Sequence, residues 1–284
     1  MPAAIPLHIG DINTLEVIRE TSIGVYLNDG GEGILLPKRF VPAGLKVGEK
    51  IPVFLYHDSE DRLIATTQQP LGRVGEIVPL RAVTVTNLGA FLDWGLMKDI
   101  FVPKSQMRMP MRVGGIYIVR IYVDERTGRV AASEKIEPFL HNDPLTVKEK
   151  EEVDLITYRR TDIGYTMIIN GKHTGVLHFS DIFRNIQVGD RMKGFIKAIR
   201  PENKIDLVLG TQGHTRIGGD AGKILELLEA HGGFLPYQDK SDPDDIYGFF
   251  GISKKAFKMA IGNLFKQKRI QITDSGIKKI EDQA

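Results

Sequence analysis

Histidine, carboxylate and glycine patterns are where catalytic chemistry would first show in this sequence. The seven histidines are His8, His57, His141, His173, His178, His214 and His231. His173 and His178 are five residues apart, but no carboxylate cluster surrounds them, and the chain has no His-Glu-x-x-His pair. It also has no phosphate-binding Gly-x-x-x-x-Gly-Lys loop and no serine-centred elbow. We therefore expect no enzyme, catalytic residue, metal site, cofactor or small-molecule substrate.

Two strings look like ligand sites but have simpler explanations. Gly30-Gly31-Glu32-Gly33 falls between expected strands, so we interpret it as a turn. Asp242, Asp244 and Asp245 stand where a helix is expected to begin, and carboxylates are favoured at that end of the helix dipole.

Basic residues suggest a different kind of chemistry near the C-terminus. Residues 253–273 contain six basic side chains and no acidic one. On an expected helix, Lys254, Lys258 and Lys266 can share the face opposite an apolar stripe. This face could contact nucleic acid, or it could be a solvated lysine face on a module that binds protein.

The elements that position such residues come from a block that occurs three times. Its cores read Ile23-Gly24-Val25-Tyr26-Leu27, Leu88-Gly89-Ala90-Phe91-Leu92 and Ile163-Gly164-Tyr165-Thr166-Met167. An apolar run follows each core, and then a glycine turn at residue 48, 115 or 189. Three copies in order, at nearly equal offsets, predict three copies of one small domain.

Each repeat has the pattern of a five-stranded β-barrel. In the second repeat, strands are expected over 76–86, 90–94, 100–102, 116–123 and 129–133, separated by turn residues. Five short strands bury a core best by closing on themselves, which gives an oligonucleotide-binding (OB) fold. Trp94, the only tryptophan, is expected to pack in the core or between domains, and Phe101 in the core.

Two strings in these repeats resemble signatures of the S1 RNA-binding domain. They are Asn87-Leu88-Gly89-Ala90-Phe91-Leu92-Asp93 and Gly175-Val176-Leu177-His178-Phe179-Ser180-Asp181. In that family, aromatic side chains beside the turn glycine, a histidine on the third strand, and an Asp and a basic residue near the last turn contact RNA. The resemblance implies these sites: Tyr26, Asp58 and Arg62 in the first repeat; Phe91, Asp124 and Arg129 in the second; His178 and Lys204 in the third.

No repeat has the full set of family residues. Leu88 stands at an aromatic position and Val102 at the histidine position of the second repeat. The other departures are Ile23 and Leu36 in the first repeat and Ile163 and Thr166 in the third. Each single site should therefore be weak, and affinity should come from several sites joined together.

An exposed aromatic ring stacks with any base, which supports these assignments on physical grounds. The alternatives are that Phe91 and Tyr26 are core residues, that His178 bonds inside its barrel, and that Arg62 and Arg129 are solvated turn charges.

The C-terminal region changes from strands to helices. We expect a linker over 211–219, a helix capped by Asp220, a second helix starting at residues 241–245, and a third from Ser253 to about Lys268. On the third helix, the spacing of Phe257, Ala260, Ile261, Leu264 and Phe265 predicts one buried stripe. A hairpin over 269–280 completes the pattern of a winged helix, an α+β domain.

The whole chain is thus predicted to be a multidomain, mainly β protein. Its domains are three tandem S1-type OB barrels at 1–69, 70–140 and 141–213, and a winged helix at 214–284. This order resembles the conserved virulence factor B family of bacteria. The resemblance implies RNA binding and post-transcriptional regulation, without catalysis. Phe91, Arg129 and the net charge of +3 in the second repeat favour single-stranded RNA over duplex DNA.

Composition is compatible with that function. The four predicted domains carry net charges of −3, +3, +1 and +1, so a polyanion should prefer the second barrel. There is no cysteine, no apolar run long enough to cross a membrane and no visible secretory signal, so we expect a cytoplasmic protein without a membrane partner. Two other functions stay open: a winged-helix DNA-binding regulator, and a scaffold on a ribosome or RNA-degradation complex.

Overall fold

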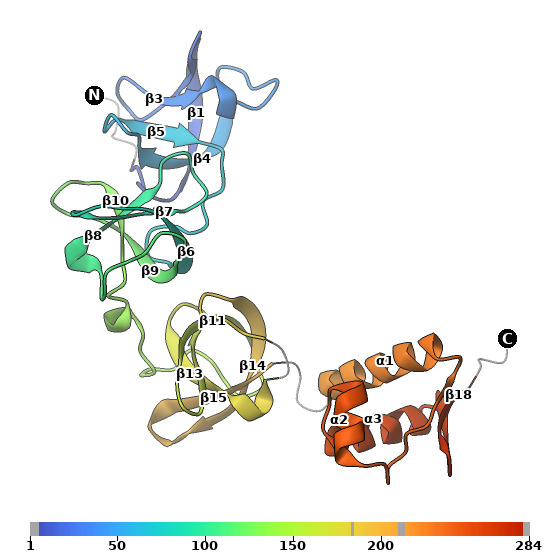
Figure 1. Ribbon diagram of the computed structural model, residues 1–284. Helices are drawn as coiled ribbons and strands as arrows, with labels where there is room; N and C mark the ends of the chain where they lie inside the picture. Colours follow the sequence, from blue (N-terminus) through green and yellow to red (C-terminus); the bar gives the residue numbers. More distant parts are fainter. Residues whose placement is uncertain (1–5, 183–184, 210–213, 281–284) are drawn as a thin grey trace. The chain divides into compact units, whose positions relative to one another are not determined.

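A computed structural model describes residues 6–182, 185–209 and 214–280. The chain divides into two compact units. The first contains two β-barrels and most of a third, and the second contains the C-terminal helices and hairpin with short segments of the third barrel. Figure 1 shows the barrels in blue, green and yellow and the helices in orange and red.

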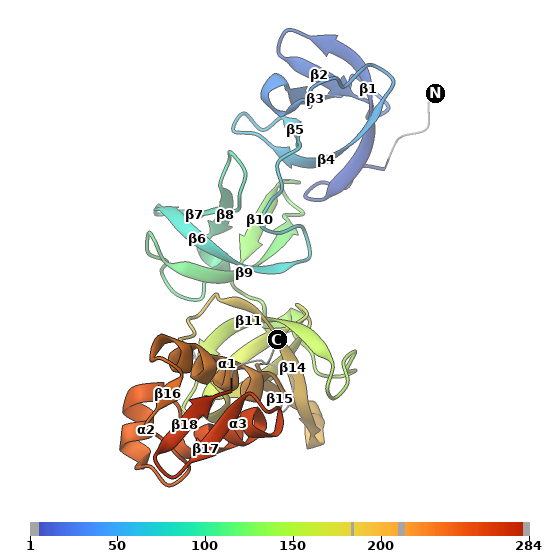
Figure 2. The same ribbon diagram turned by 90° about the vertical axis from the view of Figure 1, so that its right-hand side faces the viewer.

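All three barrels are closed and have five strands. The first contains β1 (Ile12–Thr21), β2 (Gly24–Leu27), β3 (Ile34–Pro37), β4 (Lys50–His57) and β5 (Leu63–Thr66). The second contains β6 (Ile77–Val85), β7 (Gly89–Asp93), β8 (Ile100–Pro103), β9 (Ile116–Val123) and β10 (Val130–Ser133). The third contains β11 (Glu152–Arg160), β12 (Gly164–Ile169), β13 (His173–His178), β14 (Arg191–Arg200) and β15 (Lys204–Val208). Figure 2 shows the strands of the first barrel closing into a ring.

The strand order is the same in each barrel. The first strand pairs with the second and the fourth, and the third lies beside the fifth, which closes the ring. A β-bulge interrupts the first strand in each case, after Val17, Ala82 and Thr157, and lets the long strand bend around the core. Short 3-10 helices follow the third strands: η1 (Lys38–Phe40), η2 (Lys104–Gln106) and η4 (Phe179–Asp181). Two more are η3 (Glu137–Phe139) and η5 (Pro201–Asn203).

The first two barrels pack against each other through part of the hydrophobic core of the second barrel, while the rest of the first barrel's core forms a separate cluster. Phe54 and Tyr56 of β4 belong to the same cluster as the core of the second barrel. The centroid of the Trp94 indole ring lies 5.5 Å from that of the Phe54 ring and 6.3 Å from that of the Tyr56 ring, in T-shaped contacts. Its Nε1 donates a hydrogen bond to the Lys98 carbonyl oxygen at 2.6 Å. The expected packing of Trp94 between domains is confirmed.

The C-terminal region is a winged helix. It contains α1 (His214–Ala230), β16 (Phe234–Leu235), α2 (Pro243–Phe250), α3 (Lys254–Lys266), β17 (Ile270–Thr273) and β18 (Gly276–Lys279). Asp242 caps α2 and Ser253 caps α3, each accepting a hydrogen bond from a backbone N–H of the first turn. The predicted fold class is therefore confirmed, while the exact residue boundaries of the four domains stay predictions.

Two expectations for this domain were wrong. The predicted linker includes residues 214–219, but α1 begins at His214, six residues before the expected cap at Asp220. Packing of Ile224 and Leu228 in the hydrophobic core stabilises α1. The helix can therefore extend toward its N-terminus through two glycines, each of which costs about 1 kcal/mol relative to alanine. Phe265 is exposed rather than buried, because Phe257, Ala260, Ile261 and Leu264 already fill the buried stripe.

The turn glycines permit a close approach of two strands. An ideal Cβ on Gly24, Gly89 or Gly164 would lie 2.1–2.2 Å from a carbonyl oxygen of the third strand. We predict that Gly89→Ala destabilises the second barrel by about 2 kcal/mol or more, because backbone must move to admit the methyl group. Urea unfolding followed by fluorescence of Trp94 would measure this.

Gly262→Ala is the matched control for this prediction. A Cβ at Gly262, in the middle of α3, meets nothing within 4 Å. It should leave the Trp94 transition unchanged. An equal midpoint for Gly89→Ala and the wild type would contradict the role of the close approach.

Candidate nucleic-acid interface

Strand register shows which positions are equivalent among the barrels. Gly89 pairs with Pro103 across β7 and β8, and Gly164 pairs with His178 across β12 and β13. In the first barrel, Gly24 pairs with Pro37. The expectation that Val102 and Leu36 stand at the histidine position was therefore wrong by one residue. Both are fully buried core residues, because alternate residues of a strand face opposite sides.

The residue before each turn glycine is apolar and exposed. The exposed fractions are 57% for Ile23, 78% for Leu88 and 58% for Ile163. An apolar side chain is therefore exposed to solvent at the same place in all three repeats. We call the surface made by residues 88, 91, 101 and 103 of the second barrel, and by their register equivalents in the other two, the glycine face.

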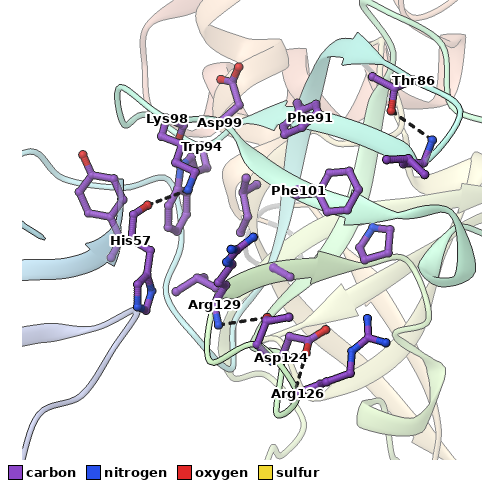
Figure 3. A pocket seen from close by; sticks show the side chains of 17 residues that line it. His57, Thr86, Phe91, Trp94, Lys98, Asp99, Phe101, Asp124, Arg126 and Arg129 are labelled. Atoms are coloured by element: carbon purple, nitrogen blue, oxygen red, sulfur yellow. Dashed lines mark hydrogen bonds between the residues drawn. The ribbon is translucent and has the colours of Figure 1, made fainter. Parts of the chain in front are cut away.

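The glycine face of the second barrel carries an aromatic pair. Phe91 and Phe101 are cross-strand partners on β7 and β8, and their ring centroids are 5.0 Å apart. Both rings are half-buried and line a cavity of about 590 Å³, together with Leu88 and Pro103 (Figure 3). The expectation that Phe101 is a core residue was wrong, since it lies on the same face as Phe91.

Polar side chains stand on the other wall of this cavity. The turn between β9 and β10 is held by Asp124, whose Oδ1 accepts hydrogen bonds from the backbone N–H groups of Arg126 (2.9 Å) and Thr127 (3.0 Å). Arg126 and Arg129 are exposed and line the cavity with Asp124. Two cationic side chains and an aromatic pair therefore line one cavity, a combination that proteins binding single-stranded nucleic acids use for bases and phosphates.

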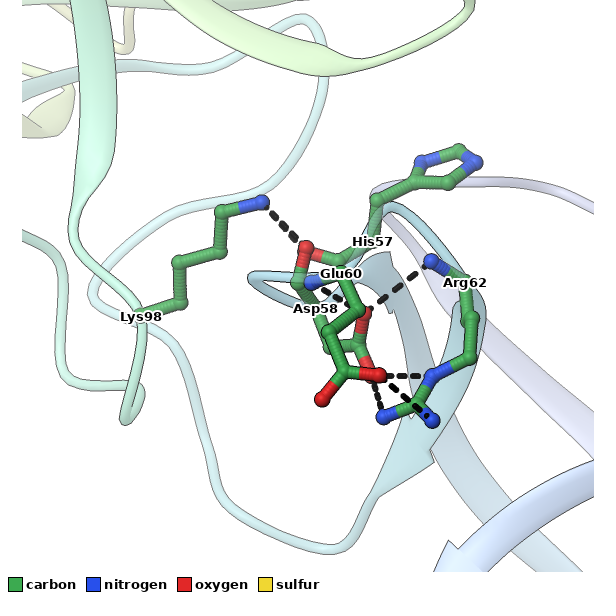
Figure 4. A network of polar contacts seen from close by, with 5 residues as sticks. All are labelled: His57, Asp58, Glu60, Arg62 and Lys98. Carbon is green, nitrogen blue, oxygen red and sulfur yellow. Dashed lines mark hydrogen bonds and ion pairs between the residues drawn. The ribbon is translucent and has the colours of Figure 1, made fainter.

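The first barrel completes the rim of the cavity. Tyr56 and His57 line it from β4. Lys98 joins the two barrels, because its Nζ donates hydrogen bonds to the carbonyl oxygens of His57 (3.0 Å) and Asp58 (2.6 Å), a contact drawn in Figure 4. The Arg129 guanidinium forms an ion pair with Asp61 of the first barrel.

Burial changes the acid–base properties of groups at this rim. It lowers the pKa of Lys98 and of His57, in each case more strongly than the carboxylate of Asp61 raises it. The pKa of Asp99, which lines the cavity, is raised by burial and by the nearby Asp93. His57 is thus held toward its neutral form, with a ring nitrogen, Nδ1, that has no hydrogen-bond partner among the residues that the structure describes.

In the first barrel, the residues predicted to contact RNA interact with neighbouring side chains. Tyr26 is half-buried and the Arg19 guanidinium lies 4.0 Å from its ring centroid. Arg62 forms an ion pair with Asp58 at 2.7 Å and with Glu60 at 2.9 Å (Figure 4). Burial raises the pKa of Asp58, but the hydrogen bonds from Arg62 and the Glu60 backbone outweigh it and leave the pKa lowered. These pairings agree with the expectation, still a prediction, that this barrel adds little net attraction for a polyanion.

The predicted residues of the third barrel and the winged helix have surroundings of their own. His178 is half-buried at the end of β13, and Lys204 is exposed and paired with Glu202 at 2.6 Å. On α3, Lys258 and Lys266 are exposed and Lys254 is half-buried. The Lys258 Nζ lies 3.6 Å from a carboxylate oxygen of Asp239.

Three predicted residues, namely Phe91, Asp124 and Arg129, line this cavity together. Sequence reasoning missed Phe101 and Arg126 as members of this site. Phe101 could have been found by placing Pro103 opposite Gly89, which puts it across from Phe91. The binding roles of all the single residues stay predictions.

Other kinds of site are not seen in the described part of the chain. No group of three or more His, Asp or Glu side chains among residues 6–182, 185–209 and 214–280 is arranged to hold a metal ion. Among those residues, no helix has the length and apolar character required to cross a membrane.

Known families match both ends of the chain. Residues 9–68 match the model of the S1 domain, and residues 222–278 match the model of the CvfB-like winged helix domain. Domains of these two kinds bind nucleic acids and are typically not catalytic. They indicate nucleic acid binding for this chain.

Similar proteins extend over nearly the whole chain. The uncharacterized protein YitL of Bacillus subtilis is 28% identical over 264 residues, covering 90% of this chain and 89% of YitL. Conserved virulence factor B of Staphylococcus epidermidis is 25% identical over 291 residues (96% and 98% covered), and that of Staphylococcus aureus is 27% identical over 280 residues (93% and 91%). A solved multidomain protein with nucleic acid binding domains from Streptococcus pneumoniae is 25% identical, with 96% and 98% covered and a TM-score of 0.46.

Proposed function

We propose that this chain, whose resemblance to the conserved virulence factor B family is confirmed, binds single-stranded RNA and acts in post-transcriptional regulation. The barrels and the winged helix would supply contacts to one RNA chain without catalysing a reaction on it. A cytoplasmic location is part of the proposal, because the RNA would be met there.

The aromatic pair on the second barrel carries this proposal. Phe91 and Phe101 line an open cavity beside Arg126 and Arg129. A base must leave its stack to lie on a phenyl ring, which a single strand permits at low cost and a duplex does not. Carboxylates of Asp99 and Asp124 line the same cavity and could accept a hydrogen bond from a ribose 2′-hydroxyl, which favours RNA over DNA.

Charge and number of sites decide how tight the binding can be. The predicted second domain has a net charge of +3 and the first of −3. Since each barrel has only part of the S1-type set, a single contact would be weak. Several barrels on one chain raise the effective concentration of the next site for an RNA already held, so affinity should depend on RNA length.

One observation favours a protein partner for the winged helix instead. Its helices expose Tyr247 on α2 and Met259 and Phe265 on α3, next to the lysines. Exposed apolar side chains of this size favour contact with a protein, such as a component of a ribosome or an RNA-degradation complex. Lysine variants of α3 distinguish the two roles.

The deciding experiment compares ligands under one set of conditions. The full chain is titrated with labelled single-stranded RNA, single-stranded DNA and duplex DNA over a series of salt concentrations. Binding to RNA well above duplex DNA, with a clear salt dependence, supports the proposal. Tighter binding to duplex DNA would support the winged-helix DNA regulator, and no binding at low salt would support the scaffold.

We predict that the stacking role of Phe91 depends on its aromatic ring. Phe91→Leu should weaken binding of single-stranded RNA by about 1–3 kcal/mol, and Phe91→Tyr should largely keep it. Fluorescence of Trp94 checks that the barrel is folded in both variants. If Leu and Tyr at this position bind equally well, the ring does not stack with a base.

A second prediction concerns the ion pair between Arg129 and Asp61. An RNA phosphate must compete with Asp61 for the guanidinium, so Asp61→Asn should tighten RNA binding by roughly 1.4- to 5-fold, the range for an exposed ion pair. Asn suits this site because residue 61 has a left-handed backbone with a φ of 71°.

Glu60→Gln removes the same charge one residue away and is the matched control. Glu60 pairs with Arg62 rather than with Arg129. Asp61→Asn should have the larger effect, and it should have none in an Arg129→Ala background. Equal effects of the two variants would mean that only the overall charge of the turn matters.

A third prediction tests the lysines of α3. Changing Lys254, Lys258 and Lys266 together to Ala should flatten the salt dependence of RNA binding, by roughly 0.7 in slope for each phosphate that a lysine no longer neutralises. The exposed barrel lysines Lys46, Lys50 and Lys148, changed together, remove the same charge elsewhere. An unaltered slope in the α3 variant would assign the winged helix to protein binding.

A further inference from the structure

The third barrel differs from the other two at one position of its glycine face. The residue after Pro37, Pro103 or His178 begins a 3-10 helix in every barrel. It is a lysine in the first two barrels, Lys38 and Lys104, and a phenylalanine, Phe179, in the third. The third barrel therefore has an aromatic ring where the others have a flexible cation.

A backbone hydrogen bond fixes where this residue lies. The Phe179 N–H donates to the carbonyl oxygen of Ile163 at 3.1 Å. The equivalent bonds run from Lys38 to Ile23 at 2.8 Å and from Lys104 to Leu88 at 2.9 Å. Phe179 is thus adjacent to the exposed residue before the turn glycine, at the edge of the glycine face.

The surroundings of Phe179 are built as a supported platform. Phe179 is 38% exposed, and its ring meets that of Tyr165 in a T-shaped contact, with centroids 5.7 Å apart. The Tyr165 hydroxyl donates a hydrogen bond to the Ile186 carbonyl oxygen at 2.9 Å, which fixes the supporting ring. The Arg160 guanidinium lies 5.3 Å from the Phe179 centroid, and Ile163 is exposed beside it.

We propose that Phe179 is the base-stacking residue of the third barrel and that Arg160 binds the adjoining phosphate. The two positions at which the S1-type pattern has aromatic residues hold Ile163 and Thr166 here, and neither has a ring. Phe179 supplies the ring from the neighbouring strand end, within the same exposed area. Its ligand is an unpaired base of a single-stranded nucleic acid, so this inference rests on the proposed function.

A supported aromatic ring suits this role on physical grounds. A ring already fixed by Tyr165 loses little conformational freedom when a base stacks on it, so more of the stacking energy appears as affinity. A guanidinium can stack with a base and neutralise a phosphate at the same time. A phenylalanine that served only to fill the barrel core would be enclosed, whereas Phe179 remains more than one-third exposed.

The chain offers a closely matched control for Phe179. Phe139, in η3, is 44% exposed and also lies under a guanidinium, that of Arg120 at 3.8 Å. It begins no 3-10 helix after a third strand and is not part of a glycine face. The same substitution at both positions therefore shows whether the position of the ring on the barrel, rather than its exposure alone, determines RNA binding.

The test measures binding of a fluorescein-labelled, single-stranded RNA of mixed sequence to the full chain. Phe179→Leu should weaken binding by roughly 5- to 150-fold, the range for removal of one base–aromatic stack, and Phe179→Tyr should restore it. Phe139→Leu should change it less than about twofold. Equal weakening at 179 and 139, or no weakening at 179, would overturn the proposal.

Two further measurements keep this result separate from the proposed function. If Phe91→Leu weakens binding and Phe179→Leu does not, RNA binding stands and the role of Phe179 fails. If the wild type does not bind RNA, the proposed function itself fails. A 5-iodouracil RNA cross-linked by light to the wild type should attach at Phe179. This readout does not depend on how well the Leu variant folds, and attachment elsewhere in the third barrel would count against the proposal.

Discussion

The close approach at the turn glycine is the constraint on which the candidate binding surface depends. In each barrel the second strand begins at a glycine that lies against a carbonyl oxygen of the third strand, where a Cβ would come within 2.1–2.2 Å. This contact sets the register of the two strands. The register in turn places Phe91 opposite Phe101, and His178 opposite Gly164. Without it, the exposed apolar residue and the aromatic side chains would not share one face.

The electrostatic design of the chain favours many weak contacts. Arg62, Arg129, Lys204 and Lys258 are all paired with carboxylates in the structure. Exposed ion pairs of this kind are weak, so little free energy is lost when a phosphate replaces the carboxylate. The new pair with the phosphate is weak for the same reason, so each exchange adds little affinity. Affinity for a long polyanion would then accumulate from several exchanges, whereas short fragments would bind poorly.

Sequence patterns were sufficient for the architecture and insufficient for the site. Repeats, turn glycines and helix caps depend on local chemistry, so the barrels and the winged helix could be predicted from them. The third strands could not be aligned in the same way, because runs such as Ile100-Phe101-Val102 are apolar on both faces. Only the cross-strand partner shows that Phe101 faces the cavity and Val102 the core. The extent of α1 was missed because tertiary packing, rather than local propensity, decides whether two glycines join a helix.

The same register explains how an aromatic side chain at one place on the barrel surface can come from either of two strands. The hydrogen bond from the residue after the third strand to the residue before the glycine joins positions 38 and 23, 104 and 88, and 179 and 163. A side chain from either member of each pair reaches the same solvent-facing area. An aromatic ring in that area can therefore be supplied by either strand. Tyr165 then becomes important as a support, because its ring packs against the ring of Phe179 just beyond the end of the third strand.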